Sequence, residues 1–257
     1  MSLIVQNLNY EYENFKLRNI NLELKGGNLY GLLGANASGK STFFNCVMHI
    51  LNPSGGNIYI NNENIANKTS SWMAKQISYV AQNHHVDFGF SVYDLVAMGR
   101  YVHKKSIFGL GKTDKKMIDY ALEFVGISHL KNTSITKLSG GQKQLVFLAR
   151  SLAQDTPIIL LDEPTSALDF KNQILLCKIL KQLTKTGKCI FFCTHDINHV
   201  LWFCDKVVAF KNGEILAYGD VKSVINDEML AKIYGDICTL ENIKNTSVAM
   251  PKSTSSI

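Results

Sequence analysis

The sequence lacks the long apolar segments and the leader that would place it within a membrane or outside the cell. No run of apolar side chains in its 257 residues approaches the length of about eighteen that a spanning helix needs. Its first residues contain neither the charged region nor the apolar region of a secretory signal. We therefore expect the chain to stay in the cytosol and to reach a membrane only through a partner.

The cysteine spacing of a metal site or a redox motif is also missing. No two cysteines form a C-x-x-C pair, and most lie in apolar stretches, as expected for reduced cytosolic thiols. The histidine pair at 84–85 has no second group of ligands at recognisable spacing, so we interpret it as part of a loop. The six cysteines are Cys46, Cys177, Cys189, Cys193, Cys204 and Cys238.

Basic clusters interleaved with aromatic side chains are absent, although the formal net charge is +6. Lysine and arginine are scattered, and small groups such as Lys104-Lys105 and Lys115-Lys116 are typical of a solvated surface. The charge therefore indicates no nucleic-acid partner.

The most specific motif that the sequence does contain is a glycine-rich loop at residues 34–41, which matches G-x-x-x-x-G-K-[ST]. A strand-like run at 28–33 precedes it and a helix-like run at 41–51 follows, which is the context that a phosphate-binding loop requires. In such a loop the backbone amides surround an anion, Lys40 reaches the terminal phosphates and the Ser41 hydroxyl binds magnesium. Ala37 stands at a free position of the motif, and we expect it to be tolerated unless the backbone there needs a positive φ.

A second signal is a short apolar run at 158–161 that ends in Asp162 and Glu163. Open α/β sheets bind ligands beyond the carboxyl ends of their strands, so these acids should lie beside the phosphates. Asp162 suits the role of holding magnesium, and Glu163 suits that of orienting or deprotonating a water.

A third signal is Leu-Ser-Gly-Gly-Gln at residues 138–142. Ser139 and Gln142 fit a capping box, which alone predicts an ordinary helix start. A cap does not need two glycines in the first turn, whereas bare amides at the positive end of a helix suit the approach of a phosphate. Both interpretations are open on these residues alone. The apolar face of the helix is formed by Leu145, Leu148, Ala149 and Leu152.

Together with a later Thr194-His195-Asp196, these motifs resemble the ATP-binding cassette ATPases, over residues 3 to 234. The resemblance implies an α/β fold, with a P-loop NTPase core of the ABC type at 1–84 and 155–238 and an inserted helical subdomain at 85–154. Strand and helix signals agree: strands at 77–80 and 189–194, helices at 91–100, 113–125 and 174–183, and a hairpin at Asn212-Gly213. We expect little order in the polar tail at 239–257.

The resemblance also assigns roles to single residues. Gln82 would link magnesium and water to the helical subdomain, and His195 would touch the γ-phosphate. An aromatic residue would stack on adenine, and this is Tyr12 or, as the competing choice, Tyr10. The catalytic residues are thus Glu163, His195 and Gln82, and the metal-binding ones are Ser41, Gln82 and Asp162. The dimer-facing loop is Ser166, Ala167, Leu168 and Asp169. The nucleotide-binding residues are Tyr12, Gly34, Ala35, Asn36, Ala37, Ser38, Gly39, Lys40, Ser41, Thr42, Ser139, Gly140, Gly141 and Gln142.

The resemblance implies a homodimer that uses ATP and Mg²⁺. Ser139 and Gly141 would lie on the helical subdomain, away from their own phosphate loop, and would complete the site of a second subunit. ATP would then hold two copies together until hydrolysis removes the charge.

Residues 98–103, Met-Gly-Arg-Tyr-Val-His, together with 88–92, resemble the import ATPases for siderophore-bound iron, haem and cobalamin, although Val102 replaces the usual proline. The expected protein is the ATP-hydrolysing subunit of a membrane importer, peripheral on the cytoplasmic face. Its groove near residues 82–100 would receive helices of permease subunits, and an external substrate-binding protein would act through that permease. The alternative is a non-transport cassette such as one for iron–sulfur cluster assembly. A DNA-repair or translation cassette would carry long coiled coils or a second cassette, which the sequence lacks.

Overall fold

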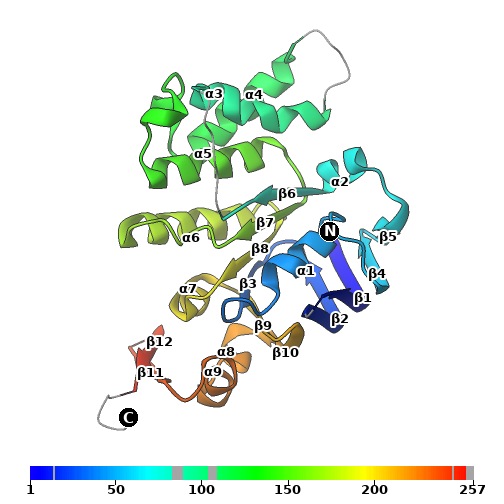
Figure 1. The fold of residues 1–257 in the computed structure, drawn as a ribbon. Helices are drawn as coiled ribbons and strands as arrows, with labels where there is room; N and C mark the ends of the chain where they lie inside the picture. The colour runs from blue at the N-terminus through cyan, green and yellow to red at the C-terminus, as the bar shows by residue number, and fades with distance from the viewer. Residues whose placement is uncertain (14, 83–88, 104–108, 245, 253–257) are drawn as a thin grey trace.

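A six-stranded, mostly parallel sheet forms the centre of the fold in the computed structural model, which describes residues 1–13, 15–82, 89–103, 109–244 and 246–252 (Figure 1). Its strands run in the order β10-β9-β3-β8-β7-β6. In three of them every residue is buried, as expected for strands that helices cover on both faces. The strands are β3 (Leu29–Leu33), β6 (Ile77–Val80), β7 (Ile158–Asp162), β8 (Cys189–Thr194), β9 (Lys206–Lys211) and β10 (Glu214–Asp220).

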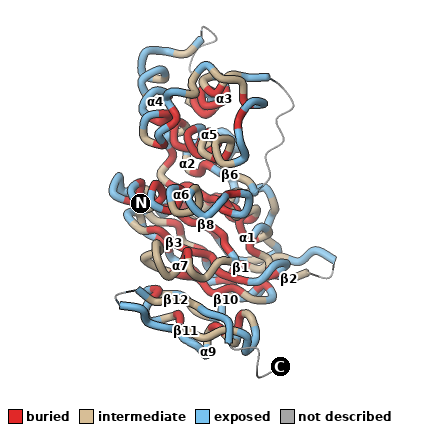
Figure 2. Tube along the Cα trace, turned by 90° about the vertical axis from the view of Figure 1, so that its left-hand side faces the viewer, coloured by how far each residue is buried: buried red, intermediate tan, exposed pale blue. Residues whose placement is uncertain are grey.

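A second, antiparallel sheet lies beside the first, with the order β2-β1-β4-β5. Helix α1 (Lys40–Val47) packs its Phe43 and Phe44 into the core between the two sheets, and the rings of Phe44 and Phe191 lie 5.2 Å apart. Figure 2 shows the buried residues continuing from this region through the central strands into the helical part above. The strands are β1 (Ser2–Tyr12), β2 (Phe15–Lys25), β4 (Gly55–Ile60) and β5 (Glu63–Asn64).

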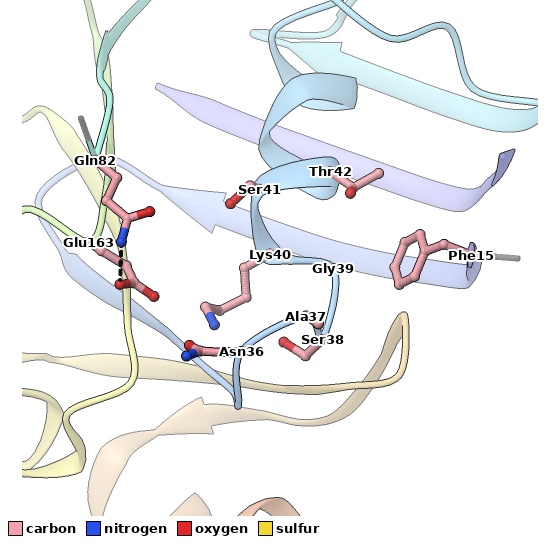
Figure 3. A pocket seen from close by; sticks show the side chains of 10 residues that line it. All are labelled: Phe15, Asn36, Ala37, Ser38, Gly39, Lys40, Ser41, Thr42, Gln82 and Glu163. Atoms are coloured by element: carbon pink, nitrogen blue, oxygen red, sulfur yellow. Dashed lines mark hydrogen bonds between the residues drawn. The ribbon is translucent and has the colours of Figure 1, made fainter. Parts of the chain in front are cut away.

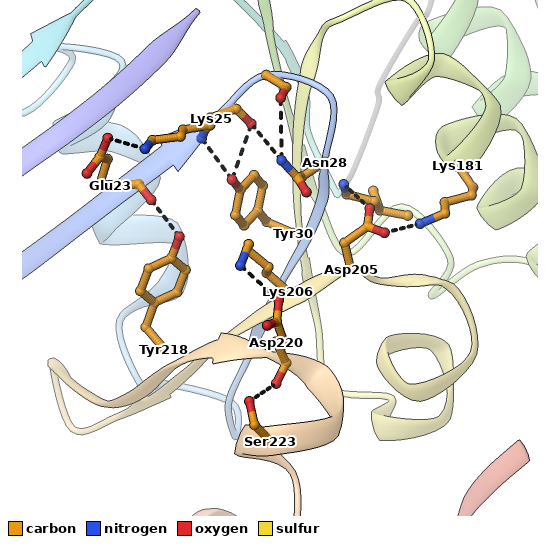
Figure 4. Close-up of polar contacts among 12 residues, drawn as sticks. Glu23, Lys25, Asn28, Tyr30, Lys181, Asp205, Lys206, Tyr218, Asp220 and Ser223 are labelled. Carbon is orange, nitrogen blue, oxygen red and sulfur yellow. Dashed lines mark hydrogen bonds and ion pairs between the residues drawn. The ribbon is translucent and has the colours of Figure 1, made fainter.

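Polar contacts join the antiparallel sheet to the edge of the central one (Figure 4). The Tyr218 hydroxyl on β10 donates to the Glu23 carbonyl on β2 at 2.6 Å. Asp205, just before β9, accepts a hydrogen bond from the Leu29 amide at 2.9 Å and also pairs with Lys181. These contacts set the start of β3, the strand that leads into the glycine-rich loop.

The segment between β6 and β7 forms a separate helical lobe, drawn at the top of Figure 1. Its helices bury one face against one another, with Ile118, Ala121 and Leu122 of α4 among the fully buried side chains. Gly126 ends α4 at φ 77°, as its position predicts. The helices are α3 (Val92–Ala97), α4 (Lys112–Phe124) and α5 (Gly140–Ala153). The boundary near residue 84 lies outside the described residues, so the exact extent of the subdomain stays a prediction.

The prediction of a helix over residues 91–100 is wrong for the last three residues. Helix α3 ends at Ala97, and residues Met98–His103 form a 3₁₀ helix instead. Gly99 approaches the backbone of α5 so closely that a Cβ there would lie 2.4 Å from the Arg150 carbonyl oxygen. Buried Arg100 donates to the Ala153 carbonyl at 2.8 Å and to Asp114 at 3.0 Å. The Met-Gly-Arg stretch therefore fastens the carboxyl end of α5.

Other helices differ from expectation mainly at their ends. The expected helix at 41–51 stops at Val47, and the one expected from 174 begins at Phe170 because Asp169 caps it, accepting from the Asn172 amide at 2.8 Å. The strands expected at 77–80 and 189–194 and the hairpin at Asn212-Gly213 are confirmed. The remaining helices are α2 (Ser70–Gln76), α6 (Phe170–Thr184), α7 (Ile197–Phe203), α8 (Val221–Val224) and α9 (Asp227–Tyr234).

The expectation of little order after residue 238 is wrong for residues 238–243 and 246–251. They form a hairpin of β11 (Cys238–Ile243) and β12 (Thr246–Pro251), paired from Cys238–Pro251 to Ile243–Thr246. The hairpin packs on α7, so contacts distant in sequence order a segment whose own composition is polar. Residues 253–257 lie outside the described part. Within that part, none of the helices has the length and apolar character needed to span a bilayer.

Replacing Gly99 with alanine should destabilise the helical lobe. The new methyl group would overlap the Arg150 carbonyl, which is backbone and cannot turn away, so we expect Gly99→Ala to lower the free energy of unfolding by about 1–3 kcal/mol. Gly89→Ala is the matched control, because a Cβ there meets its nearest atom, Ser134 Oγ, at an ordinary 3.6 Å. Urea denaturation measures both variants. Equal midpoints for the two would contradict this account of the Met-Gly-Arg stretch.

Candidate active site

A pocket of about 480 Å³ opens at the carboxyl-terminal edge of the central sheet, around the glycine-rich loop (Figure 3). β3, β6, β7 and β8 run parallel, so the segments that follow them converge on this edge. The loop supplies most of the wall, and Gln82 and Glu163 face it from after β6 and β7. The lining residues are Phe15, Asn36, Ala37, Ser38, Gly39, Lys40, Ser41, Thr42, Gln82 and Glu163.

The glycine-rich loop is held in a tight curve by its own groups. The Lys40 side chain, 5% exposed, donates to the carbonyls of Gly34 and Ala35 at 2.8 and 3.0 Å. Gly39 has φ 105°, and a Cβ there would lie 2.3 Å from the ring of Phe15, so only glycine fits. The hydroxyl of Ser38 is buried and has no hydrogen-bond partner among the described residues. The loop thus places a cation and backbone amides around one small space, which suits phosphate.

Ala37 is the residue for which the sequence expectation needs correction. Its φ is 59°, in the left-handed region, so the backbone does require the conformation that glycine adopts without penalty. An alanine there costs about 1–2 kcal/mol. The loop nevertheless keeps its shape, because Lys40 and the fixed Gly39 hold it on one side.

The three residues predicted to be catalytic meet around one carboxylate. Glu163 Oε2 accepts a hydrogen bond from Gln82 Nε2 at 2.9 Å, drawn as a dashed line in Figure 3, and lies 3.4 Å from His195 Nδ1. Glu163 itself has φ 45°, an uncommon value for this residue type. Its carbonyl accepts from Ser166 Oγ at 3.0 Å, and its amide donates to the Cys193 carbonyl at 3.2 Å. The strained turn therefore fixes the carboxylate at the pocket.

Asp162 lies deeper, at the end of β7, and is buried. It accepts a hydrogen bond from the Tyr79 hydroxyl at 3.3 Å. Burial raises the pKa of Tyr79, and the negative charge of Asp162 raises it further, so the phenol stays protonated and donates. The described residues contain no cluster of three or more His, Cys, Asp or Glu side chains that could hold a metal by themselves. Hydroxyl, amide and carboxylate oxygens from Ser41, Gln82 and Asp162 suit Mg²⁺, which keeps phosphate and water ligands beside few protein ones.

The Leu-Ser-Gly-Gly-Gln segment is at the start of α5, and its capping box is confirmed. Ser139 Oγ accepts from the Gln142 amide at 3.3 Å, and Gln142 Oε1 accepts from the Ser139 amide at 3.1 Å. Ser139 and Gly140 are exposed, and none of residues 139–142 lines the pocket of its own chain. The capped helix start is therefore free to meet another molecule.

The aromatic side chain in the pocket lining is Phe15, which the sequence argument did not name. Tyr10 packs against the core, while Tyr12, paired with Phe15 across the hairpin, is 61% exposed. The choice of the residue that stacks on adenine stays a prediction. The sequence argument missed Phe15 because it considered only the Tyr-x-Tyr strand. The signal was available in the pairing of a hairpin, which places Phe15 opposite Tyr12.

The dimer-facing loop predicted at 166–169 lies next to the active site. Ser166, Ala167 and Asp169 are exposed, whereas Leu168 is buried in the core of the helical lobe. The following Phe170 is a large apolar side chain that is also exposed. The loop thus has an anchored residue and an exposed surface.

The family pattern described as ABC transporter matches residues 17–166, more than half of the chain. The chain belongs to the family of ABC transporter ATPases. As a member of this family it is an ATP-binding protein and an ATP hydrolase, as its motifs predict. The α/β P-loop NTPase fold of the ABC type is likewise confirmed.

Relatives of this ABC ATPase are similar over nearly their whole length. The ferric enterobactin transport ATP-binding protein of Escherichia coli (strain K12) is 33% identical, over 91% of this chain and 87% of the relative. The manganese transport system ATP-binding protein of Halalkalibacterium halodurans is 36% identical, over 91% of this chain and 93% of the relative. Among solved structures, an inward-facing putative metal-chelate type ABC transporter has a TM-score of 0.86 at 28% identity, and covers 100% of this chain and 99% of that one.

Replacing Ala37 with glycine should stabilise this ABC ATPase. The change removes a left-handed alanine at about 1–2 kcal/mol but adds freedom to the unfolded chain at about 0.4–1 kcal/mol, so we expect a net gain of roughly 0.5–1 kcal/mol. Ala35→Gly is the matched control, an exposed alanine of the same loop whose φ is not positive, and it should lose stability. Thermal unfolding without nucleotide measures both. A lower midpoint for Ala37→Gly would show that the strain is absent.

Proposed function

We propose that this chain is the ATP-hydrolysing subunit of a membrane importer for a metal chelate, of the class that carries iron-siderophore, haem or cobalamin. The observation that carries the proposal is a groove of about 500 Å³ where the core meets the helical lobe, and its lining lies outside residues 82–100, where the sequence predicted the groove. Tyr79 lines this groove and also donates to Asp162, so a partner seated there touches a residue bonded to the active site. The groove is lined by Met48, His49, Ile50, Lys68, Ser70, Met73, Ala74, Ile77, Tyr79, Arg150 and Gln154.

Within the active site, each residue has a separate task. The loop amides and Lys40 bind the phosphates, and Glu163 accepts the proton of the attacking water. His195 contacts the γ-phosphate. Gln82, whose side-chain amide donates to Glu163 at 2.9 Å, links magnesium and water to the helical lobe. Ser41, Gln82 and Asp162 would hold Mg²⁺, which would supply positive charge beside the phosphates. Tyr12 and Phe15 contact the adenosine end.

The working unit is a homodimer. A single chain leaves the capped start of α5 exposed and away from its own pocket, although two glycines at the positive end of a helix suit a phosphate. A second copy supplies that phosphate, and the exposed residues 166–170 border the contact. ATP therefore closes the dimer, and its hydrolysis releases it.

The transport partners follow from the groove and from the Met-Gly-Arg stretch. Helices of permease subunits enter the groove, which places this chain peripherally on the cytoplasmic face, and an external substrate-binding protein delivers the cargo to the permease. Resemblance of residues 98–103 to chelate importers and the full coverage by a metal-chelate type structure support this cargo over free manganese. No feature of the site favours the iron–sulfur assembly alternative.

Glu163→Gln should retain ATP binding and lose at least about a hundredfold in turnover, because the amide cannot take the proton of water. With ATP and magnesium it should then form a stable dimer, measured by gel filtration with light scattering beside a phosphate-release assay. Glu214→Gln is the control and should turn over normally, because this exposed carboxylate pairs with Arg18 away from the pocket.

A second change tests the dimer contact in the same background. Ser139→Arg added to Glu163→Gln should bind ATP as a monomer and fail to dimerise, since bulk and charge occupy the phosphate contact. Ser128→Arg, exposed elsewhere on the helical lobe, should leave the dimer intact. Normal turnover in Glu163→Gln would remove this residue from the chemistry, and dimers that form despite Ser139→Arg would assign the segment a structural role alone.

The importer assignment is tested by affinity purification of the tagged chain from detergent-solubilised native membranes. We expect a stoichiometric integral membrane partner, which Ala74→Arg abolishes by filling the groove while ATP turnover of the isolated subunit persists. Ala66→Arg, exposed outside the groove lining, should keep the partner. Recovery of soluble partners only, or a membrane partner indifferent to Ala74→Arg, would contradict the proposal.

A further inference from the structure

The C-terminal part of the chain contacts the backbone of the histidine in the active site. Tyr234, the last residue of α9, donates its hydroxyl to the carbonyl oxygen of His195 at 3.0 Å. Burial raises the pKa of Tyr234, with the charge of Asp196 adding to the rise, so the hydroxyl remains a donor at neutral pH. The nucleotide motifs make no use of this residue, which lies far from them in sequence.

The helix that follows His195 is held by the same part of the chain. Asp196 caps α7 by accepting from the amide of Asn198 at 2.8 Å. The Asn198 side chain in turn pairs with both backbone groups of Ala249 on β12: its Oδ1 accepts from the amide at 2.8 Å and its Nδ2 donates to the carbonyl at 3.4 Å. Trp202 adds a hydrogen bond from Nε1 to the Ser247 carbonyl at 3.1 Å. The two hydrogen bonds between Asn198 and Ala249 fix the position of α7 along β12.

Helix α9 and the hairpin form one unit rather than two separate contacts. Asp227 Oδ1, at the start of α9, accepts from the Leu240 amide on β11 at 2.6 Å and from the Thr239 hydroxyl at 3.2 Å. The Lys252 amide donates to the Ile237 carbonyl at 2.9 Å, and its side chain pairs with Asp236. Residues 227–244 and 246–252 are therefore joined to one another, and they hold the His195 segment at the carbonyl of His195 and at the first turn of α7.

We propose that residues 227–244 and 246–252 are a positioning element for the active site, and that Tyr234 is the positioning residue that holds His195 where it can contact the γ-phosphate. The inference rests on the proposed role of His195. The His195 side chain is 53% exposed, and its Nδ1 lies 3.4 Å from Glu163. The ring therefore has room to move, and the position of the His195 backbone determines which positions the ring can reach. Tyr234 fixes the backbone from behind the pocket, without contact to the nucleotide.

The test compares Tyr234→Phe with Tyr218→Phe, which removes the same kind of bond, from a tyrosine hydroxyl to the Glu23 carbonyl, at the far edge of the sheet. We expect Tyr234→Phe to lower kcat about three- to tenfold, the effect of one hydrogen bond, while the ADP affinity and the thermal midpoint match those of Tyr218→Phe. In the Glu163→Gln background it should raise the ATP concentration needed for dimers by a similar factor. Asn198→Ala, which frees α7 from β12, should act in the same direction.

A purely structural role would change ADP affinity and thermal stability together with turnover, and that outcome overturns the inference. It is also overturned if Tyr234→Phe and Asn198→Ala both match Tyr218→Phe while His195→Ala is inactive, a result that leaves the proposed active site standing. If His195→Ala itself turns over normally, the proposed role of His195 fails and the positioning inference fails with it.

Discussion

The constraint on which the rest of the structure depends is the shared direction of β3, β6, β7 and β8. Parallel strands bring their carboxyl ends to one edge, so four segments distant in sequence meet there without any further device. The glycine-rich loop follows β3, Gln82 follows β6, Glu163 follows β7 and His195 follows β8. Because β3, β7 and β8 are buried along their whole length, none of these three can slide without exposing apolar side chains, and the core sets the spacing of the groups that follow them.

Helix α5 extends that order into the helical lobe. Its amino end presents the capped Ser139 outward, while its carboxyl end is fastened by Arg100 and by Gln154, which donates to the carbonyls of Ala74 and Ile77 at the groove. Helix α5, 14 residues long, thus connects the groove proposed for the permease with the surface proposed for the second subunit. The close approach of Gly99 leaves no side chain between the two backbones at the carboxyl end of this helix.

The residues that line the pocket at the glycine-rich loop could be predicted largely from sequence because their motifs are local. The loop at 34–41, Asp162-Glu163 and Ser139 with Gln142 each act through groups a few residues apart, so spacing carries the geometry. The features that were missed depend on distant partners. The hairpin at 238–251 is ordered by Asn198 and Trp202, and the 3₁₀ turn at 98–103 follows from the packing of Gly99 on α5. Phe15 reaches the pocket only through its pairing with Tyr12. These contacts join residues that are far apart in the sequence, so local composition cannot predict them.

Two non-glycine residues in the left-handed region, Ala37 and Glu163, border the same pocket. Each costs free energy that a more relaxed backbone would avoid, and strain of this kind persists only where the surroundings over-determine the conformation. At Glu163 the surroundings are visible: Cys193, Ser166 and Gln82 each bond to it. The proposed cycle gives two of these partners a further part, since Gln82 shortly precedes the helical lobe in sequence and Ser166 belongs to the predicted dimer-facing loop. All three contacts already hold the strained carboxylate within the single chain, so a shift of Gln82 or Ser166 in the proposed cycle would act directly on its position.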